Sequence, residues 1–121
     1  MTLGRQATGA YGEHLAVDYL RQNNYHIVTT NWRCTTGEID IVARDGDTLV
    51  FVEVRTRRRA TVEAAFASIT PAKQQKLVQA AYIYLGEHNL DDAMWRIDVI
   101  GVALPHGKKP IIKHAEDALD W

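Results

Sequence analysis

The chain has 121 residues, a length that fits a single domain, 1–121, with a hydrophobic core of its own. Hydrophobic residues make up 46% and charged residues 24% of the sequence, as in an ordinary soluble globular domain, and no apolar stretch is long enough to cross a bilayer. The net charge of −1 does not by itself indicate a nucleic-acid partner, and the single cysteine, Cys34, excludes an internal disulfide and a cysteine-based zinc cluster.

The N-terminal residues 1–13 lack the apolar core of a signal peptide, so we expect a cytoplasmic protein with no membrane partner. An amphipathic helix is predicted over residues 9–21, with Thr8 as its N-cap. Glu13 falls in the early turns of this helix, where the helix dipole favours a carboxylate. A functional role for Glu13 is an equally open alternative.

Residues 25–33, YHIVTTNWR, are rich in β-branched and aromatic side chains and predict a first strand. Residues 37–59, GEIDIVARDGDTLVFVEVRTRRR, predict a β-hairpin that turns at Asp45-Gly46, because glycine accepts the positive φ of a tight hairpin turn. This hairpin places carboxylates inside two apolar strands, where an unpaired charge is costly to hold.

The register of the hairpin decides which acids share a face of the sheet. If the loop has an even number of residues, Asp40 faces Phe51 or Glu53, and Asp40, Glu53 and Arg55 lie on one face. The same face would also carry Glu38, Val42 and Leu49. An odd loop or a bulge would separate Asp40 from Glu53 and exclude a shared site.

Residues 60–68 show no clear period and predict a loop or a short helical turn over the sheet. Thr70-Pro71 is a well-formed helix start, which predicts a helix over residues 70–85 that stops at Gly86. Lys73 and Lys76 lie near its start, against the preference of the helix dipole. This placement hints at a bound anion, but on sequence alone we favour the alternative that both lysines are solvated.

Residues 95–104, WRIDVIGVAL, predict a fourth strand, in which Asp98 either joins a metal site or, as we favour, pairs with an arginine. Residues 110–114 predict a last strand at an edge of the sheet, because it begins with proline. Together these elements predict an α/β fold around a mixed sheet.

Asp40 and Glu53 are the candidate ligands of a divalent cation, because Mg²⁺ and Mn²⁺ prefer carboxylates, waters and phosphate oxygens. The carbonyl oxygen of Val54 completes this candidate set, and Arg55 is placed to contact a phosphate. A basic rim follows, which would neutralise phosphates of a nucleic acid; it consists of Arg57, Arg58, Arg59, Lys73 and Lys76.

A set of ion pairs on a solvated sheet face is the alternative for Asp40, Glu53, Arg55 and Arg57, since such pairs are common and contribute little. The apolar run 50–54 argues against it, because Glu53 lies in a segment that is predicted to be buried on both faces.

Several motifs in a fixed order resemble the YraN family of small bacterial proteins. They are Gly9-x-x-Gly12-Glu13, Gly37-Glu-Ile-Asp40-Ile-Val, Val50-Phe-Val-Glu53-Val-Arg55, Ser68-Ile-Thr-Pro-x-Lys73 and Arg96-x-Asp98. That family is assigned to the PD-(D/E)xK nucleases and is similar to archaeal Holliday junction resolvases. The resemblance implies a restriction-endonuclease-like fold, with a mixed central sheet of about five strands flanked by helices.

By this resemblance, Asp40 and Glu53 take the places of the two metal-binding carboxylates, and Glu13 matches a glutamate on the first helix of the resolvases. Arg55 stands where the motif has a lysine that is thought to orient or activate the attacking water. Arginine supplies the charge but no proton-accepting amine, so Lys73 or Lys76 is a candidate substitute. A homodimer is also implied.

The sequence therefore predicts an endonuclease that uses Mg²⁺ or Mn²⁺ to hydrolyse phosphodiester bonds in DNA, with branched or otherwise structured DNA as a candidate substrate. The alternative is a catalytically inactive module that binds nucleic acid or a partner and keeps the nuclease fold. Arg55 is the main support for the alternative.

Overall fold

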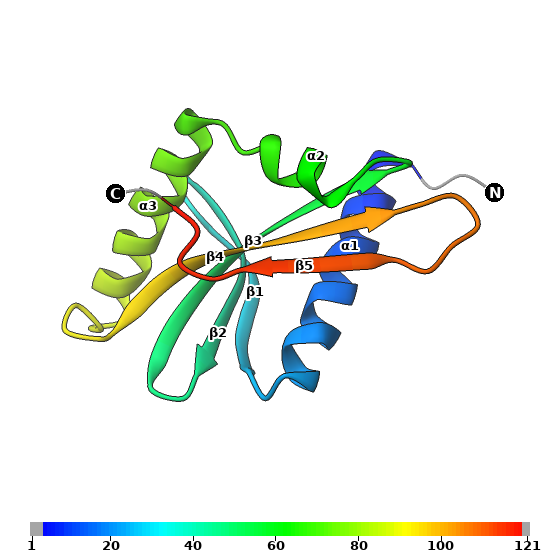
Figure 1. Cartoon of the computed structure of the whole chain (residues 1–121). Coiled ribbons are helices and arrows are strands. Elements are labelled where there is room, and N and C mark those ends of the chain that lie inside the picture. Colours follow the sequence, from blue (N-terminus) through cyan, green and yellow to red (C-terminus); the bar gives the residue numbers. More distant parts are fainter. Residues whose placement is uncertain (1–3, 120–121) are drawn as a thin grey trace.

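The computed structural model of the chain describes residues 4–119 and has an α/β fold (Figure 1). In chain order its elements are α1 (Arg5–Gln22), β1 (His26–Cys34), β2 (Gly37–Asp45), β3 (Thr48–Arg58), α2 (Val62–Ala67), α3 (Pro71–Glu87), β4 (Trp95–Leu104) and β5 (Ile111–Ala115). The five-stranded mixed sheet with flanking helices confirms the predicted fold class and is consistent with a restriction-endonuclease-like fold.

The sheet has the strand order β1-β2-β3-β4-β5. Strands β3 and β4 run parallel, and every other neighbouring pair is antiparallel. The connection from β3 to β4 passes through α2 and α3, as a parallel crossover requires. Strand β5 pairs only with β4, so the last strand lies at an edge of the sheet as predicted.

Helices cover both faces of the sheet, with α1 on one side and α2 and α3 on the other (Figure 1). Leu77, Ala81 and Leu85 of α3 pack with Phe51 in one core cluster, whereas Ala16 and Leu20 of α1 pack with Val52 in the other. Central strands buried on both faces explain the continuous apolar run of β3. None of the helices within residues 4–119 is long and apolar enough to cross a membrane.

The start of α1, the hairpin turn and the end of α3 differ from the sequence predictions. Helix α1 begins at Arg5 rather than Gly9, so Thr8 is not its N-cap but a helical residue that packs against the sheet and is only 7% exposed. The hairpin turns at Gly46-Asp47 instead of Asp45-Gly46, with Gly46 at φ +60°. A glycine with positive φ at the first central position is the requirement of a type II′ turn.

The third difference is the end of α3, which continues past Gly86 to Glu87. Asn89, with φ +56°, takes the left-handed conformation that was predicted for the glycine. The start of α3 is as predicted, because the hydroxyl of Thr70 accepts a hydrogen bond from the backbone N–H of Lys73 at 3.3 Å. The predicted short helical turn in 60–68 is α2.

Gly12 allows α1 to approach β3 very closely. A Cβ atom at this position would lie 2.8 Å from Cβ of Thr56 and would also clash with its hydroxyl oxygen. Because Cβ of Thr56 is fixed to the backbone of β3, rotation of the threonine side chain does not remove the clash. Gly9, one turn earlier in the same helix, has no atom within 4 Å of such a Cβ.

We therefore expect opposite effects from the two glycine substitutions in α1. Gly12→Ala should lower the free energy of unfolding by about 1–3 kcal/mol, because α1 must move away from β3. Gly9→Ala is the matched control and should raise it by about 0.5–1 kcal/mol, since alanine favours the helix. Urea denaturation measures both. Equal effects of the two substitutions would contradict the close approach of α1.

Candidate active site

The pairing of β2 with β3 ends just before the two acids. The register runs from Asp45 opposite Thr48 to Ile41 opposite Val52. The next position on each strand is an acid, Asp40 on β2 and Glu53 on β3. Beyond them, the backbone N–H of Val54 donates to Oδ2 of Asp40 at 2.8 Å. The carboxyl group of Asp40 thus accepts a hydrogen bond from β3 at the point where the backbone pairing of β2 and β3 ends.

The even loop of the hairpin is confirmed, but the regular alternation of side chains fails locally at Asp40. Ile39 and Val42 are three positions apart on β2 and yet belong to the same core cluster, on the side of α3. Ile41, between them, belongs to the cluster beneath α1. Asp40 therefore departs from the predicted common face, whereas Glu53 and Arg55 keep to it.

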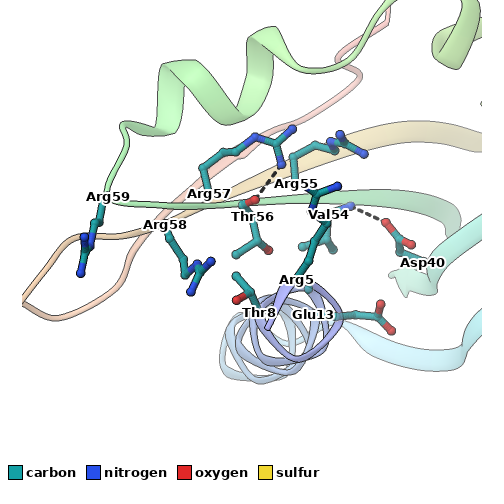
Figure 2. A pocket seen from close by; sticks show the side chains of 11 residues that line it. Arg5, Thr8, Glu13, Asp40, Val54, Arg55, Thr56, Arg57, Arg58 and Arg59 are labelled. Carbon is teal, nitrogen blue, oxygen red and sulfur yellow. Dashed lines mark hydrogen bonds between the residues drawn. The ribbon is translucent and has the colours of Figure 1, made fainter. Parts of the chain in front are cut away.

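Asp40 lines a cavity of about 910 Å³ beside α1, together with Glu13 and Arg55 (Figure 2). Glu53 lines a smaller cavity of about 210 Å³ beside α3, which Arg55 also lines. The two acids nevertheless interact, because the charge of Glu53 contributes to the raised pKa of Asp40. Where β2 and β3 stop pairing, no continuous sheet separates the two carboxyl groups.

Burial raises the pKa of both acids. At Asp40 the desolvation of the carboxyl group is the largest cause of the raised pKa, and the Glu53 charge adds to it, while the bond from Val54 opposes it. At Glu53 desolvation again raises the pKa, against the lowering effects of Arg55 and, more weakly, of Lys73. Such perturbed pairs are a common property of functional sites.

Glu13 projects from α1 and lines the same cavity as Asp40 (Figure 2). Desolvation raises the pKa of Glu13, although a hydrogen bond of 2.7 Å from Nδ2 of Asn31 to its Oε1 lowers it in part. Asn31 lies on β1 and adopts φ +53°, a conformation that asparagine tolerates better than most residues.

Arg55 is held by two contacts on the side of β3 that faces α2. Its Nη1 lies 3.5 Å from Oε1 of Glu53, and its Nε donates to Oγ of Ser68 at 2.8 Å. Ser68 in turn donates to the carbonyl oxygen of Ala65 at 2.6 Å. The guanidinium group is thus oriented by the end of α2.

The predicted basic residues divide between the two cavities. Lys73 and Lys76 line the small cavity with Glu53. The larger cavity is lined by Arg57, Arg58 and Arg59. Figure 2 shows Arg57 on the same side of β3 as Arg55, and Arg58 on the opposite side, toward α1.

Sequence reasoning missed four residues that contribute to the site, namely Arg5, Thr8, Asn31 and Ser68. Arg5 and Thr8 line the large cavity only because α1 starts one turn earlier than predicted. Because α1 starts at Arg5, the residues Arg5, Gly9 and Glu13, each four positions apart, lie on one side of the helix. Asn31 had no local signal, and Ser68 was noticed only as part of a family motif without a role, because the roles of both depend on contacts with other elements.

Asp98 has the structural role that was favoured for it. It is completely buried and accepts hydrogen bonds from Nε of Arg96 at 3.0 Å and from the backbone of Asp117 at 3.0 Å, and its Oδ2 lies 2.7 Å from Nε2 of His114. These partners lower its pKa, although burial opposes them. Asp98 is therefore a satisfied charge and not part of the candidate site.

Within residues 4–119, no three His, Cys, Asp or Glu side chains gather into a group that could hold a metal ion. Asp40 and Glu53 are thus at most a two-carboxylate site. Mg²⁺ fits such a donor set, because it commonly binds through one or two carboxylates while waters and phosphate oxygens complete its shell. A cation there would also relieve the repulsion that raises the pKa of Asp40.

The sequence matches the model of the uncharacterised protein family UPF0102 over residues 12–102. A UPF0102 protein of Geotalea daltonii is 43% identical over 112 residues, covering 93% of this chain and 88% of the relative. One from Chloroflexus aurantiacus is 48% identical over 89% of this chain and 88% of its own length. A relative from Geobacter metallireducens is 42% identical, and the match covers 99% of this chain and 98% of the relative.

The environments of Asp40 and Asp98 predict opposite effects on stability. Asp40→Asn should raise the free energy of unfolding at neutral pH by on the order of 1 kcal/mol, because asparagine keeps an acceptor for Val54 without the buried charge. Asp98→Asn should lower it by about 3–5 kcal/mol, since Arg96 loses its charged partner.

The pH dependence checks the cause of the Asp40 effect. A raised pKa in the folded protein means that wild-type stability falls as pH rises above the unfolded value of 3.8. The advantage of Asp40→Asn should therefore vanish near pH 4 and grow toward neutral pH, as measured by thermal unfolding at several pH values. Destabilisation by Asp40→Asn at every pH would contradict this account.

Proposed function

The chain belongs to the uncharacterised protein family UPF0102, and from its site we propose that it is a metal-dependent endonuclease that hydrolyses phosphodiester bonds in DNA in the cytoplasm. One observation carries the proposal: the buried carboxyl groups of Asp40 and Glu53, both with raised pKa values, line two cavities that share Arg55 and are also lined by further arginines and lysines. A site of this kind suits a divalent cation together with an anionic substrate.

In this proposal Asp40, Glu53 and the carbonyl oxygen of Val54 would hold Mg²⁺ or Mn²⁺, and the bound ion would supply the acidity of a coordinated water and the positive charge that stabilises the reacting phosphate. Asp40 must lose its proton for the ion to bind, so its raised pKa makes ion binding dependent on pH. Glu13 lines the same cavity, and its raised pKa suits a group that takes up a proton during hydrolysis.

Arg55 has the role of a phosphate contact. Its contacts with Glu53 and Ser68 keep the planar guanidinium at the boundary of the two cavities, where its N–H groups suit the oxygens of a phosphodiester. It does not act as a general base, because its pKa is too high. Lys73 lines the cavity of Glu53 and is the candidate to replace the lysine of the nuclease motif.

A binding module without turnover is the second candidate, and the contacts of Arg55 favour it. The guanidinium group is engaged by Glu53 and Ser68, and no amine stands in its place. Such a module would bind DNA in the absence of metal and leave it uncut. The homodimer stays a prediction for either function, which sedimentation equilibrium measures.

Cleavage of labelled DNA tests the proposed activity. Duplex, flap and four-way substrates are incubated with Mg²⁺ or Mn²⁺, and the wild type should cut at least one of them. Asp40→Asn and Glu53→Gln should each reduce the rate by at least about 100-fold, since each removes a charged ligand of the ion. Glu63→Gln alters an exposed acid of α2 and should leave the rate unchanged. Equal activity in all four proteins would refute the assignment of the site.

Metal binding is a separate prediction that does not depend on turnover. Calorimetric titration of the wild type with Mn²⁺ at neutral pH should show one site, and Asp40→Asn and Glu53→Gln should each weaken it by about tenfold or more. The Glu63→Gln protein again serves as the control. Mn²⁺ should also raise the melting temperature of the wild type but not that of Asp40→Asn. DNA binding without any Mn²⁺ binding would favour the inactive module.

A further inference from the structure

The large cavity extends past the candidate metal ligands to the first turns of α1, where Arg5, Thr8 and Gly9 line it opposite Arg58. Thr8 is only 7% exposed, and its hydroxyl oxygen is buried without a hydrogen-bond partner among residues 4–119. A buried hydroxyl group without a partner costs free energy, and such exceptions are rare in native structures. Packing does not explain the hydroxyl, because a valine would fill the same space.

The start of α1 is itself suited to an anion. Its N-cap, Gly4, forms no side-chain hydrogen bond, and within the described chain the first turn contains no acid. The first N–H groups of a helix are electropositive and favour a negative charge. Arg5 adds a cation at this end, which is unfavourable for an isolated helix but favourable beside a bound phosphate.

Figure 2 shows the arrangement of these residues. Thr8 rises from α1 toward β3, and the side chain of Arg58 extends from β3 toward α1. Arg5 projects from the same end of the helix. A hydroxyl group and two guanidinium groups that line one cavity suit a phosphate, because all three groups can donate hydrogen bonds to its oxygens.

We propose that Arg5, Thr8 and Arg58 form a phosphate subsite, which holds the backbone of a DNA strand beside the candidate metal site. Thr8 precedes Glu13 by five residues, or about 7.5 Å along the helix axis. This separation corresponds to about two nucleotides of axial rise along one strand. The identity of the ligand rests on the proposed function, but the subsite itself requires neither metal nor catalysis. Arg5 and Thr8 precede residues 12–102, which the family model matches.

Binding of a short labelled DNA duplex in the presence of EDTA tests the subsite. Thr8→Val should weaken binding by about fivefold, because it removes one donated hydrogen bond. The same variant should melt no earlier than the wild type, since valine keeps the shape and removes the unpartnered hydroxyl. Thr8→Ser keeps the hydroxyl and should bind as the wild type does.

Substitution of Arg5 tests the contribution of its positive charge to the subsite. Arg5→Gln should weaken binding by about fivefold and reduce the slope of log affinity against log salt by about one, as expected for one lost phosphate contact. Arg21→Gln, at the other end of the same helix and about 24 Å away along its axis, is the matched control and should change neither quantity. Unchanged binding by Thr8→Val would overturn the subsite, as would equal losses from Arg5→Gln and Arg21→Gln.

Competition with inorganic phosphate shows whether the subsite binds a DNA phosphate or free phosphate. Cleavage and binding, measured on the same variants, test the endonuclease and the subsite independently. Inorganic phosphate in moderate excess should not displace the duplex; displacement from the wild type but not from Thr8→Val would assign the subsite to free phosphate and overturn the DNA contact. If no substrate is cut but Thr8→Val still weakens duplex binding, the endonuclease proposal fails and the subsite stands. If cleavage depends on Asp40 while Thr8→Val binds normally, the subsite fails and the endonuclease stands.

Discussion

Asp40 and Glu53 occupy the positions at which β2 and β3 stop pairing, and the side chains of both acids are largely withdrawn from water. Burial raises the pKa of both acids, and the charge of Glu53 raises that of Asp40 further. This arrangement is unfavourable for folding near neutral pH, and the rest of the fold must offset its cost. The hydrogen bond from Val54 and the contact of Arg55 reduce the cost but do not remove it.

Helices from both sides of the sheet position the groups around this pair. On one side, Gly12 lets α1 approach Thr56 of β3 closely, and this approach places Glu13 beside Asp40. On the other side, Ser68 at the end of α2 orients Arg55 next to Glu53. At Gly101 of β4 the approach is less extreme, since a Cβ atom there would lie 3.1 Å from the side chain of Val62 and 3.2 Å from that of Phe66 in α2. The candidate site is therefore built on rigid elements rather than on a loop.

A comparison of the two buried aspartates separates a structural charge from a candidate functional one. Asp98 is completely buried, but Arg96, His114 and the backbone of Asp117 satisfy its carboxylate, and its pKa is lowered. Asp40 is also largely buried, but its pKa is raised, because desolvation is opposed by the hydrogen bond from the backbone of Val54 and reinforced by the charges of neighbouring acids. The partners of a buried charge, rather than the extent of its burial, thus distinguish the two roles.

The sequence by itself determined the types and order of the elements, the even hairpin loop and the placement of two acids at its far end. These depend on local patterns: side-chain alternation, a Thr-Pro helix start and glycine at a tight turn. Tertiary structure alone decided that Asp40 turns toward α1, since the strands separate where Val54 donates to its side chain. It also decided that α1 starts at Arg5 and that Thr8 is buried against β3 rather than capping the helix. These features depend on contacts between residues far apart in the chain, which no local pattern encodes.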